Sequence, residues 1–312
     1  MITISEEKIV DYDITARIAT EAFGSKDVVF SADRMKWLYE SSFGQGSIVL
    51  AVFDGDVKVG QIVLVHQKLC SGGAAGTATQ LVDLFILQAY RSPPLVRRIY
   101  QEVERLCLAQ NIRFILALPN DNAKPLNARF LKLSPLLWLQ VRAGFGFWWP
   151  RGSRLNYSGR FKSMARQQAV DLLSGFGTSA TENGLHWDGD TLFDRLSDPT
   201  CDYAVHATAD LLLISSSHKT RGVRYALLCG FFVRPQARVK SSDTRVLIRA
   251  ACRLWKHPFF VYAGINNGLP ALPGFVLPAR LRPPMLVQLR DFKTDGLDMR
   301  LDRFQLIDSD FV

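Results

Sequence analysis

Residues 81–105, LVDLFILQAYRSPPLVRRIYQEVER, constrain the fold more than any other stretch of the chain. The apolar run from Leu81 to Leu87 predicts a buried strand. A Ser-Pro-Pro corner follows, and apolar residues at helical spacing then predict a helix over about 93–110. A strand that leads directly into a helix gathers the free N–H groups of the first helical turn at one point. Such a point suits a bound phosphate.

The segments on either side of this stretch predict an α/β (α+β) fold with a mixed sheet. Two apolar runs flank Asp54-Gly55-Asp56, which is a strong hairpin signal. The Gly- and Ala-rich segment 70–79 predicts a loop. The remaining elements expected in this half are helices at 14–23, 32–39 and 126–133 and a strand at 112–118.

From about residue 151 the chain becomes more polar, and after His186-Trp187 a second series of elements repeats the order hairpin, long strand, helix, strand. The expected elements are a helix at 190–196, strands at 202–208, 210–217 and 223–233, a helix at 243–256, a strand at 258–263 and a terminal strand in LDRFQLIDSDF. Residue identities do not repeat, so the repeated fold is inferred from the order of elements alone. With 312 residues, the chain is expected to form two domains, 1–150 and 151–312.

Charge and cysteine usage narrow the classes of partner. The net charge of +9 favours an anionic partner, such as a phosphorylated small molecule, nucleic acid or a membrane surface, and the alternative is a basic surface that is only solvated. Nucleic-acid binding would rest on charge alone, because no zinc-finger or RNA-recognition signature is present. Five scattered cysteines predict reduced thiols, a cytoplasmic protein and no metal site. No apolar stretch approaches the roughly 18 residues of a membrane span.

Several short motifs, in a fixed order, resemble the GNAT N-acyltransferase superfamily. The resemblance is to a subgroup with a second, degenerate GNAT-like half, often found beside sugar and polysaccharide genes. Each motif is weak by itself, and their order is the specific signal. The motifs are Trp37-Leu38-Tyr39, Asp83 eight residues before Arg91, Tyr90-Arg91, Pro119-Asn120, Leu131-Lys132-Leu133 and Asp308-Ser309-Asp310.

This resemblance implies a site for acyl-CoA in the first half, with the second half shaping an acceptor cleft. The implied reaction transfers an acyl group, acetyl by expectation, to an amine of a small metabolite such as an amino sugar. Pantetheine would pair with the strand backbone, and the pyrophosphate would lie at the following turn. The implied donor-binding residues are Phe85, Ile86, Leu87, Arg91, Ser92, Leu95, Val96, Arg97, Arg98, Asn120 and Phe130.

The phosphate turn departs from the family pattern R/Q-x-x-G-x-G/A. It reads Arg91-Ser92-Pro93-Pro94-Leu95-Val96, and proline has no N–H to donate to phosphate. Phe130 stands where many GNAT enzymes have a tyrosine that protonates the departing thiolate. These departures favour the alternative of an inactive GNAT-like protein that binds a ligand or partner.

Asp83 is the one candidate for the catalytic base. A carboxylate within the apolar run LVDLFIL needs a partner or a raised pKa. The alternative is a structural carboxylate bonded to backbone or arginine. His66 could face the site or be structural. The aromatic residues Phe145, Phe147, Trp148 and Trp149 could form an acceptor platform or seal the two halves together.

Overall fold

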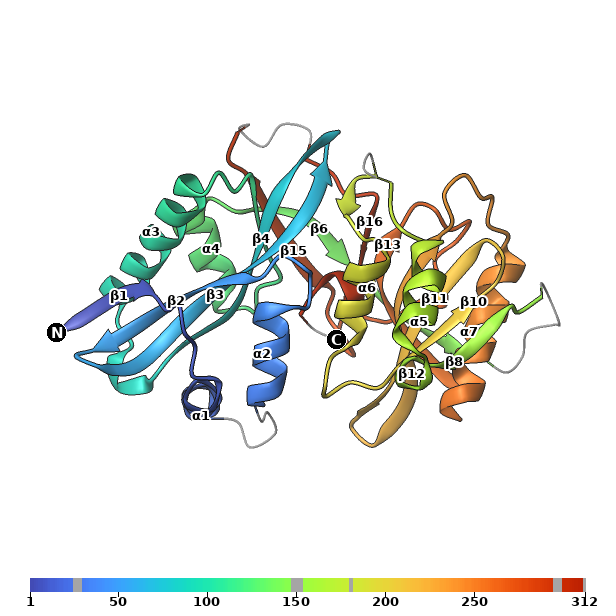
Figure 1. The fold of residues 1–312 in the computed structure, drawn as a ribbon, viewed down its shortest axis with the longest axis horizontal. Helices are drawn as coiled ribbons and strands as arrows, with labels where there is room; N and C mark the ends of the chain where they lie inside the picture. Colours follow the sequence, from blue (N-terminus) through green and yellow to red (C-terminus); the bar gives the residue numbers. More distant parts are fainter. Residues whose placement is uncertain (25–29, 147–153, 180–181, 294–298, 311–312) are drawn as a thin grey trace. The chain divides into compact units, whose positions relative to one another are not determined.

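The computed structural model describes residues 1–24, 30–146, 154–179, 182–293 and 299–310 (Figure 1). The chain forms two compact units, and each is discontinuous in sequence. The first unit comprises residues 1–69, 76–137 and 287–299, and the second comprises 70–75, 138–286 and 300–312. The expected aromatic residues Phe147, Trp148 and Trp149 lie outside the described residues.

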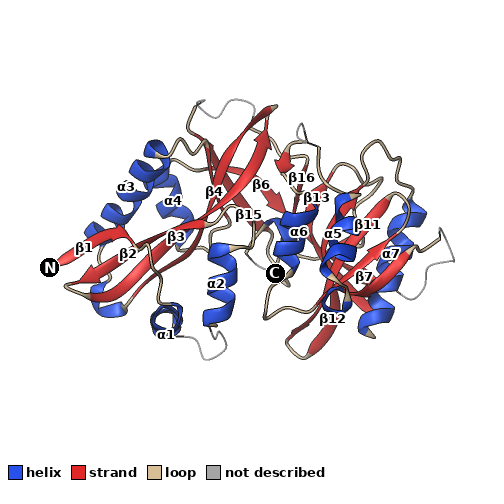
Figure 2. Ribbon diagram, in the orientation of Figure 1, coloured by secondary structure: helices blue, strands red, loops and turns tan. Residues whose placement is uncertain are grey.

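The first unit is a mixed sheet with helices on its faces (Figure 2). Its strands run in the order β1 (Ile2–Glu6), β2 (Ser47–Asp54), β3 (Val57–Ser71), β4 (Ala74–Ile86), β5 (Phe114–Ala117), β15 (Met285–Asp291) and β6 (Ser134–Leu139). Its helices are α1 (Tyr12–Phe23), α2 (Ala32–Glu40), α3 (Pro93–Ala109) and α4 (Ala123–Leu131). Only β4 and β5 are parallel among the strand pairs whose registers are described in this unit.

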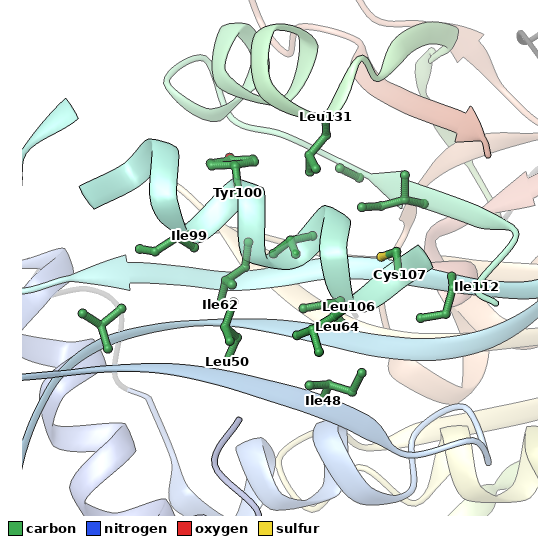
Figure 3. Close-up of a cluster of buried hydrophobic side chains, with 14 of the residues drawn as sticks. Ile48, Leu50, Ile62, Leu64, Ile99, Tyr100, Leu106, Cys107, Ile112 and Leu131 are labelled. Atoms are coloured by element: carbon green, nitrogen blue, oxygen red, sulfur yellow. The ribbon is translucent and has the colours of Figure 1, made fainter. Parts of the chain in front are cut away.

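Local chemistry accounts for the helix ends in this unit. Asp11 accepts a hydrogen bond from the N–H of Ile14 at the start of α1, and Gly24 ends the helix with a φ of 58°. Helix α3 begins with prolines at its first two positions, where their missing N–H groups cost no helical hydrogen bond. The buried face of α3 then packs on β2, β3 and β5, as Figure 3 shows.

The Gly/Ala-rich segment 70–79, expected to be a loop, is largely strand. Strand β3 continues to Ser71 and β4 starts at Ala74, so only Gly72 and Gly73 form the turn. Both glycines have positive φ, 59° and 77°, which suits a tight connection between two strands. The small residues that suggested a loop are tolerated because neighbouring strands supply the hydrogen bonds.

The second unit repeats this architecture. Its strands run in the order β14 (Phe275–Val276), β7 (Val141–Phe145), β13 (Phe259–Asn266), β12 (Val223–Val233), β11 (Leu211–Thr220), β10 (Tyr203–Ala207) and β8 (Tyr157–Arg160). Its helices are α5 (Arg166–Ser174), α6 (Gly189–Leu196) and α7 (Ser241–Trp255). The pair β12/β13 is parallel, like β4/β5. The repeated order of elements expected from the sequence is therefore present.

The two sheets exchange one strand each. Strand β15, from the C-terminal part of the chain, pairs antiparallel with β5. Strand β7, which precedes the second series of elements, pairs antiparallel with β13. The two strands occupy equivalent places in their sheets, beside the second parallel strand. This exchange makes each unit discontinuous, whereas the sequence suggested one boundary near residue 150.

Two partly buried ion pairs connect β15 to the rest of the first unit. Asp291 accepts hydrogen bonds from Arg113, with Nη2 and Oδ2 3.0 Å apart, and Arg290 lies 2.7 Å from Glu104 on α3. Because Asp291 is almost fully buried, its pairing with Arg113 is needed to offset the loss of hydration. Among the described residues, no helix is both long and apolar enough to cross a membrane.

Candidate functional site

The ladder between β4 and β5 is short. Only Ala78–Gln80 of β4 pair with Phe114–Leu116 of β5, and β4 then continues to Ile86. No other strand in the described residues takes up this side of β4. We call the β5-facing side of residues 81–86 the unpaired edge of β4. On this edge the C=O of Ile86 accepts from Nε of Arg91, and the remaining backbone groups can pair with an extended ligand.

Alternation along the strand decides which residues face the unpaired edge. The N–H of Leu87 donates to the C=O of Val59 on β3, at 2.9 Å. Because backbone groups of successive residues point to opposite sides of a strand, Phe85 faces β3 as well, and Leu84 and Ile86 face the unpaired edge. Of the three residues expected to pair with pantetheine, Ile86 is the one with this orientation.

Asp83 lies in the last part of β4 with a φ of 48°, a left-handed conformation that is rare inside a strand. Aspartate tolerates this conformation better than most residues, but it still carries strain. Burial raises the pKa of the Asp83 carboxyl, while a hydrogen bond from Tyr39 and the charge of Arg34 act in the opposite direction. A strained strand residue with a raised pKa beside an unpaired edge has the properties of a general base.

Tyr39 on α2 connects Asp83 to β3. Its hydroxyl donates to Oδ2 of Asp83 at 2.7 Å and accepts from Nε2 of Gln61 at 2.8 Å. Burial raises the pKa of Tyr39 well above its ordinary value, so its hydroxyl stays protonated. Tyr39 of the Trp37-Leu38-Tyr39 motif and Asp83 therefore belong to one hydrogen-bonded group, although they are separate motifs in the sequence.

Aromatic rings cover the end of β4. Phe23, at the end of α1, stacks on Phe30 with ring centroids 5.1 Å apart and meets Phe85 edge-on at 6.4 Å. Phe85 is buried, whereas Phe23 is 46% exposed. These rings provide an apolar surface next to the unpaired edge.

The first turn of α3 has few free donors. Pro93 and Pro94 have no N–H, and the N–H of Val96 donates to the C=O of Ser92. Leu95 is left as the residue of this turn whose N–H can meet an anion. Arg97 is exposed, and Arg98 makes a long hydrogen bond of 3.4 Å to the C=O of Ile2. Anion binding here would depend more on arginine charge than on backbone N–H groups.

The side chain of Arg91 bonds backbone carbonyl groups of two neighbouring elements. Its Nε donates to the C=O of Ile86 at 2.8 Å, and its Nη2 donates to the C=O of Ala22. The guanidinium thus joins the end of β4 to the end of α1. Ser92 occupies the N-cap position of α3 without a capping hydrogen bond from its side chain.

Asn120 and Phe130 are also engaged locally. Oδ1 of Asn120 accepts hydrogen bonds from the N–H groups of Asn122 and Ala123, at 3.1 and 2.9 Å, and so orders the start of α4. The ring of Phe130 packs against Tyr100, with centroids 5.7 Å apart. Tyr100 itself donates to Asn127 at 2.8 Å. Phe130 has no proton to give, as the sequence indicated.

His66 lies on β3 with a buried Nδ1 that has no hydrogen-bond partner in the structure. Burial lowers the pKa of His66, so the ring is neutral near pH 7. No cluster of three or more His, Cys, Asp or Glu side chains suited to a metal occurs among the residues that the structure describes.

The equivalent position in the second unit is occupied by the chain itself. Strand β13 pairs with β12 only over Phe260–Tyr262, and its later residues Gly264–Asn266 pair with β16 (Arg303–Gln305). The side chain of Gln305 bonds both backbone groups of Phe231 on β12. Its Oε1 accepts from the N–H at 2.8 Å, and its Nε2 donates to the C=O at 3.0 Å.

Buried polar groups fix this C-terminal segment. Asp308 accepts from the indole N–H of Trp187 at 2.7 Å, from the N–H of Gln305 at 2.7 Å and from Arg303 at 3.3 Å. Arg195, also fully buried, donates to the C=O of Ile307 at 3.0 Å. The sequence predicted a strand here, and the structure has a short strand followed by a 3-10 turn, Leu306–Asp308. The charges in LDRFQLIDSD were the available signal for this network.

A pocket of about 260 Å³ remains beside this segment, at the end of β12. Charged side chains that line this pocket already have hydrogen-bond partners within the protein. Arg303 bonds Glu182 at 2.9 Å, and Asp302 accepts from Asn183 and Asn267. The second unit therefore offers a ligand fewer free polar groups than the unpaired edge of β4 does.

Comparison with solved structures identifies the class of fold. A protein from Enterococcus faecalis, described as a probable N-acyltransferase, superposes with a TM-score of 0.65 at 10% identity, over 93% of this chain and 73% of that one. A tandem GNAT protein from the clavulanic acid pathway gives 0.56 at 11% identity, over 93% and 98%. The chain thus has the GNAT fold, in two tandem halves.

Saccharomyces cerevisiae N-myristoyltransferase, in a structure with bound myristoyl-CoA, also shares this fold. Its TM-score is 0.58 at 12% identity, and the match covers 100% of this chain and 84% of that protein. No family model and no curated protein sequence matches the chain. At these identities, the likeness is one of fold, and the activity must be argued from the chain's own residues.

Proposed function

We propose that the chain is an acyl-CoA-dependent N-acyltransferase whose donor site is the unpaired edge of β4. The observation that carries the proposal is the short β4/β5 ladder, which leaves strand backbone free beside a strained aspartate. The thioester arm of acyl-CoA is an extended chain with amide groups, and these can pair with the backbone of Leu84 and with the N–H of Ile86, whose C=O accepts from Arg91. The solved acyltransferases that share the fold support this reading.

Asp83 is the proposed base. The amine attacks the thioester carbonyl, so a C–N bond forms, the C–S bond breaks and CoA leaves as a thiolate. The proton lost by the nitrogen passes to the carboxylate of Asp83. With Phe130 in place of a tyrosine, the thiolate takes its proton from solvent rather than from this position. A raised pKa brings Asp83 closer to the pKa that favours proton transfer near neutral pH.

The finer assignment is an acetyl group as donor and an amino sugar as acceptor, taken from the resemblance of the sequence motifs. Phosphate binding is proposed at Leu95, Arg97 and Arg98, where positive charge offsets the missing N–H groups of Pro93 and Pro94. The five cysteines are free thiols, which supports the expected cytoplasmic setting.

Calorimetric titration with acetyl-CoA and longer acyl-CoAs tests the donor site. We expect micromolar binding at one site per chain, because the second unit fills the equivalent position with its own residues. The acyl chain length that binds best would correct or support acetyl as the donor. Absence of binding at millimolar ligand would overturn the proposal.

Turnover with a panel of amines, amino sugars included, tests the base. Asp83→Asn keeps the shape and tolerates the left-handed φ, but it cannot accept a proton. We expect turnover to fall by about 10²–10⁴-fold with acyl-CoA affinity retained. Asp33→Asn, a change of the same kind at an exposed position on α2, is the matched control and should leave turnover unchanged. Equal turnover in the two variants would exclude Asp83 as the base.

A second candidate function is ligand or partner binding without catalysis. The engaged side chain of Arg91, the prolines of α3 and Phe130 favour it. Its signature would be acyl-CoA binding without turnover across the amine panel. Failure to bind acyl-CoA at all would leave partner binding as the function to pursue.

A further inference from the structure

Asp83, Tyr39 and Gln61 form a chain of hydrogen bonds, and the Gln61 end of this chain has a polar atom without a partner. Nε2 of Gln61 donates to the Tyr39 hydroxyl, which in turn donates to Asp83. Oε1 of Gln61 is fully buried and has no hydrogen-bond partner in the structure. A buried acceptor without a donor lowers the free energy of unfolding, so the Gln61 oxygen destabilises this arrangement.

The same three side chains have a second arrangement. If Asp83 carries a proton, its O–H can donate to the Tyr39 oxygen, and the Tyr39 hydroxyl can then donate to the Gln61 carbonyl. This requires Gln61 to turn its amide over and Tyr39 to rotate its hydroxyl. One proton is added, at Asp83, and every heavy atom of Asp83 and Tyr39 stays in place. Tyr39 remains neutral in both arrangements.

We propose that Tyr39 and Gln61 are positioning residues for Asp83, and that their hydrogen-bonded chain reverses direction when Asp83 takes the amine proton. This inference rests on the proposed function. In the carboxylate state, Tyr39 donates to Asp83 and holds it ready to accept. In the protonated state, the reversed chain gives the new O–H a partner and gives Gln61 oxygen a donor, and Nε2 of Gln61 gives up its bond to Tyr39. The acceptance of a proton then needs no movement of the backbone.

The surroundings supply little competing charge. Arg34, on α2, acts on Asp83 by charge and favours the carboxylate. Tyr12, on α1, packs near Tyr39 with ring centroids 6.0 Å apart, and its hydroxyl donates to Glu40 at 3.0 Å. From β3, Lys58 lies further along the strand and is paired with Glu7. The Tyr39 hydroxyl donates to Asp83 directly.

The first test measures the pKa of Asp83 by carbon NMR of its carboxyl group, in the wild-type protein and in Tyr39→Phe. Removing the hydroxyl removes a donor to the carboxylate, so the pKa should rise by about one unit or more. Gln61→Met leaves Tyr39 without the donor that polarises it, and a smaller rise is expected. Tyr12→Phe, the same change on the adjacent helix, should leave the pKa of Asp83 unchanged.

The second test follows turnover against pH. In Tyr39→Phe, the acid limb of kcat/KM should move to higher pH by the same amount, and the KM for acyl-CoA should not change. A merely structural role for Tyr39 would lower activity at every pH without moving this limb. Gln61→Met carries both tests if Tyr39→Phe fails to fold.

The outcomes separate the two proposals. The NMR measurement needs no substrate, so a shifted pKa without turnover would support the hydrogen-bonded chain and count against the acyltransferase. Turnover that depends on Asp83, with an unchanged pKa in Tyr39→Phe and Gln61→Met, would overturn the positioning role alone.

Discussion

The two parallel strand pairs, β4/β5 and β12/β13, have the same place in their sheets and different contents. In the first unit, β4 continues past its last pair with β5 and keeps an unpaired edge. In the second unit, β16 pairs with β13, and Gln305 bonds both backbone groups of Phe231 on β12. A glutamine amide has the donor and acceptor of a peptide group, so it satisfies the strand as a ligand amide could.

This difference indicates how a repeated fold can keep one binding site and lose the other. An unpaired strand edge is a site only while its backbone groups lack partners. The C-terminal segment gives those partners to the second unit, and its own Arg303 and Asp308 are buried. The first unit has no such segment among its described residues, and beside its unpaired edge Asp83 is bonded to Tyr39 instead.

The strongest expected effect comes from opening the occupied position. Arg303→Met leaves Asp308 buried without its ionic partner, so unfolding free energy should fall by about 3–5 kcal/mol. Urea unfolding measures this change. Arg105→Met, at an exposed pair with Glu102, is the control and should change stability little. Equal stability of the two variants would mean that the segment is not held by its buried charges.

A milder change removes only the side-chain amide that mimics a ligand. Gln305→Ala leaves the N–H of Phe231 without its bond and should cost about 2–3 kcal/mol of unfolding free energy. Gln167→Ala, whose amide bonds Asp171 on the surface, should cost less than about 0.5 kcal/mol. If the two losses are alike, Gln305 contributes nothing special and the comparison with a ligand amide fails.

Burial in the second unit also keeps one histidine, His206, from binding a proton in the folded protein. His206 is fully buried between Ser158 and Ser215, and burial lowers its pKa to about 3 from an ordinary value near 6.5. Between pH 6.5 and pH 3, His206 binds a proton in the unfolded chain but not in the folded chain. Its contribution to the free energy of unfolding is therefore fully present above pH 6.5 and decreases as the pH falls towards 3. The loss should reach about 2 kcal/mol by pH 5.

Tryptophan fluorescence, to which Trp255 beside Ser215 contributes, follows this acid unfolding. His206→Gln cannot take up the proton and should flatten the dependence between pH 6.5 and 5. A variant with the wild-type slope would show that another group controls the acid stability of this unit.

The smallest expected effect is on ligand affinity, and it compares the turn after β4 in the first unit with the turn after β12 in the second. Pro94→Ala adds an N–H to the first turn of α3, and acyl-CoA affinity should rise about tenfold. Pro235→Ala adds an N–H at the equivalent turn of the second unit and should change affinity little. Calorimetry with the same acyl-CoA measures both. A gain from Pro235→Ala would place a ligand in the second unit.

Much of the fold was predictable because its signals are local. The helix at 93–110, the hairpin around Gly55 and the order of elements in both halves follow from periodicity and turn residues. The strand at residues 74–79 was missed because its Gly and Ala residues carry no strand pattern, and only pairing with neighbours makes them a strand. The exchange of β7 and β15 was missed because both strands pair with residues far away in sequence.

The candidate site was predictable only in part. Asp83 stood out as a carboxylate in an apolar run, but Gln61 carried no signal, since a glutamine in a strand is ordinary. Arg91 matched a phosphate-turn motif, yet its guanidinium bonds two backbone carbonyls. A motif records which residue types occur, and it does not record which neighbour takes up their hydrogen bonds.

The sequence by itself determined most of the helices and strands, the order in which they repeat and the loss of N–H donors at Pro93 and Pro94, because the signal for each element depends on residues a few positions apart. The tertiary structure decided which parallel pair keeps an unpaired edge, which strands the sheets exchange and that Tyr39 bonds Asp83. These outcomes join segments separated by tens to hundreds of residues, so packing and the pairing of buried polar groups select them.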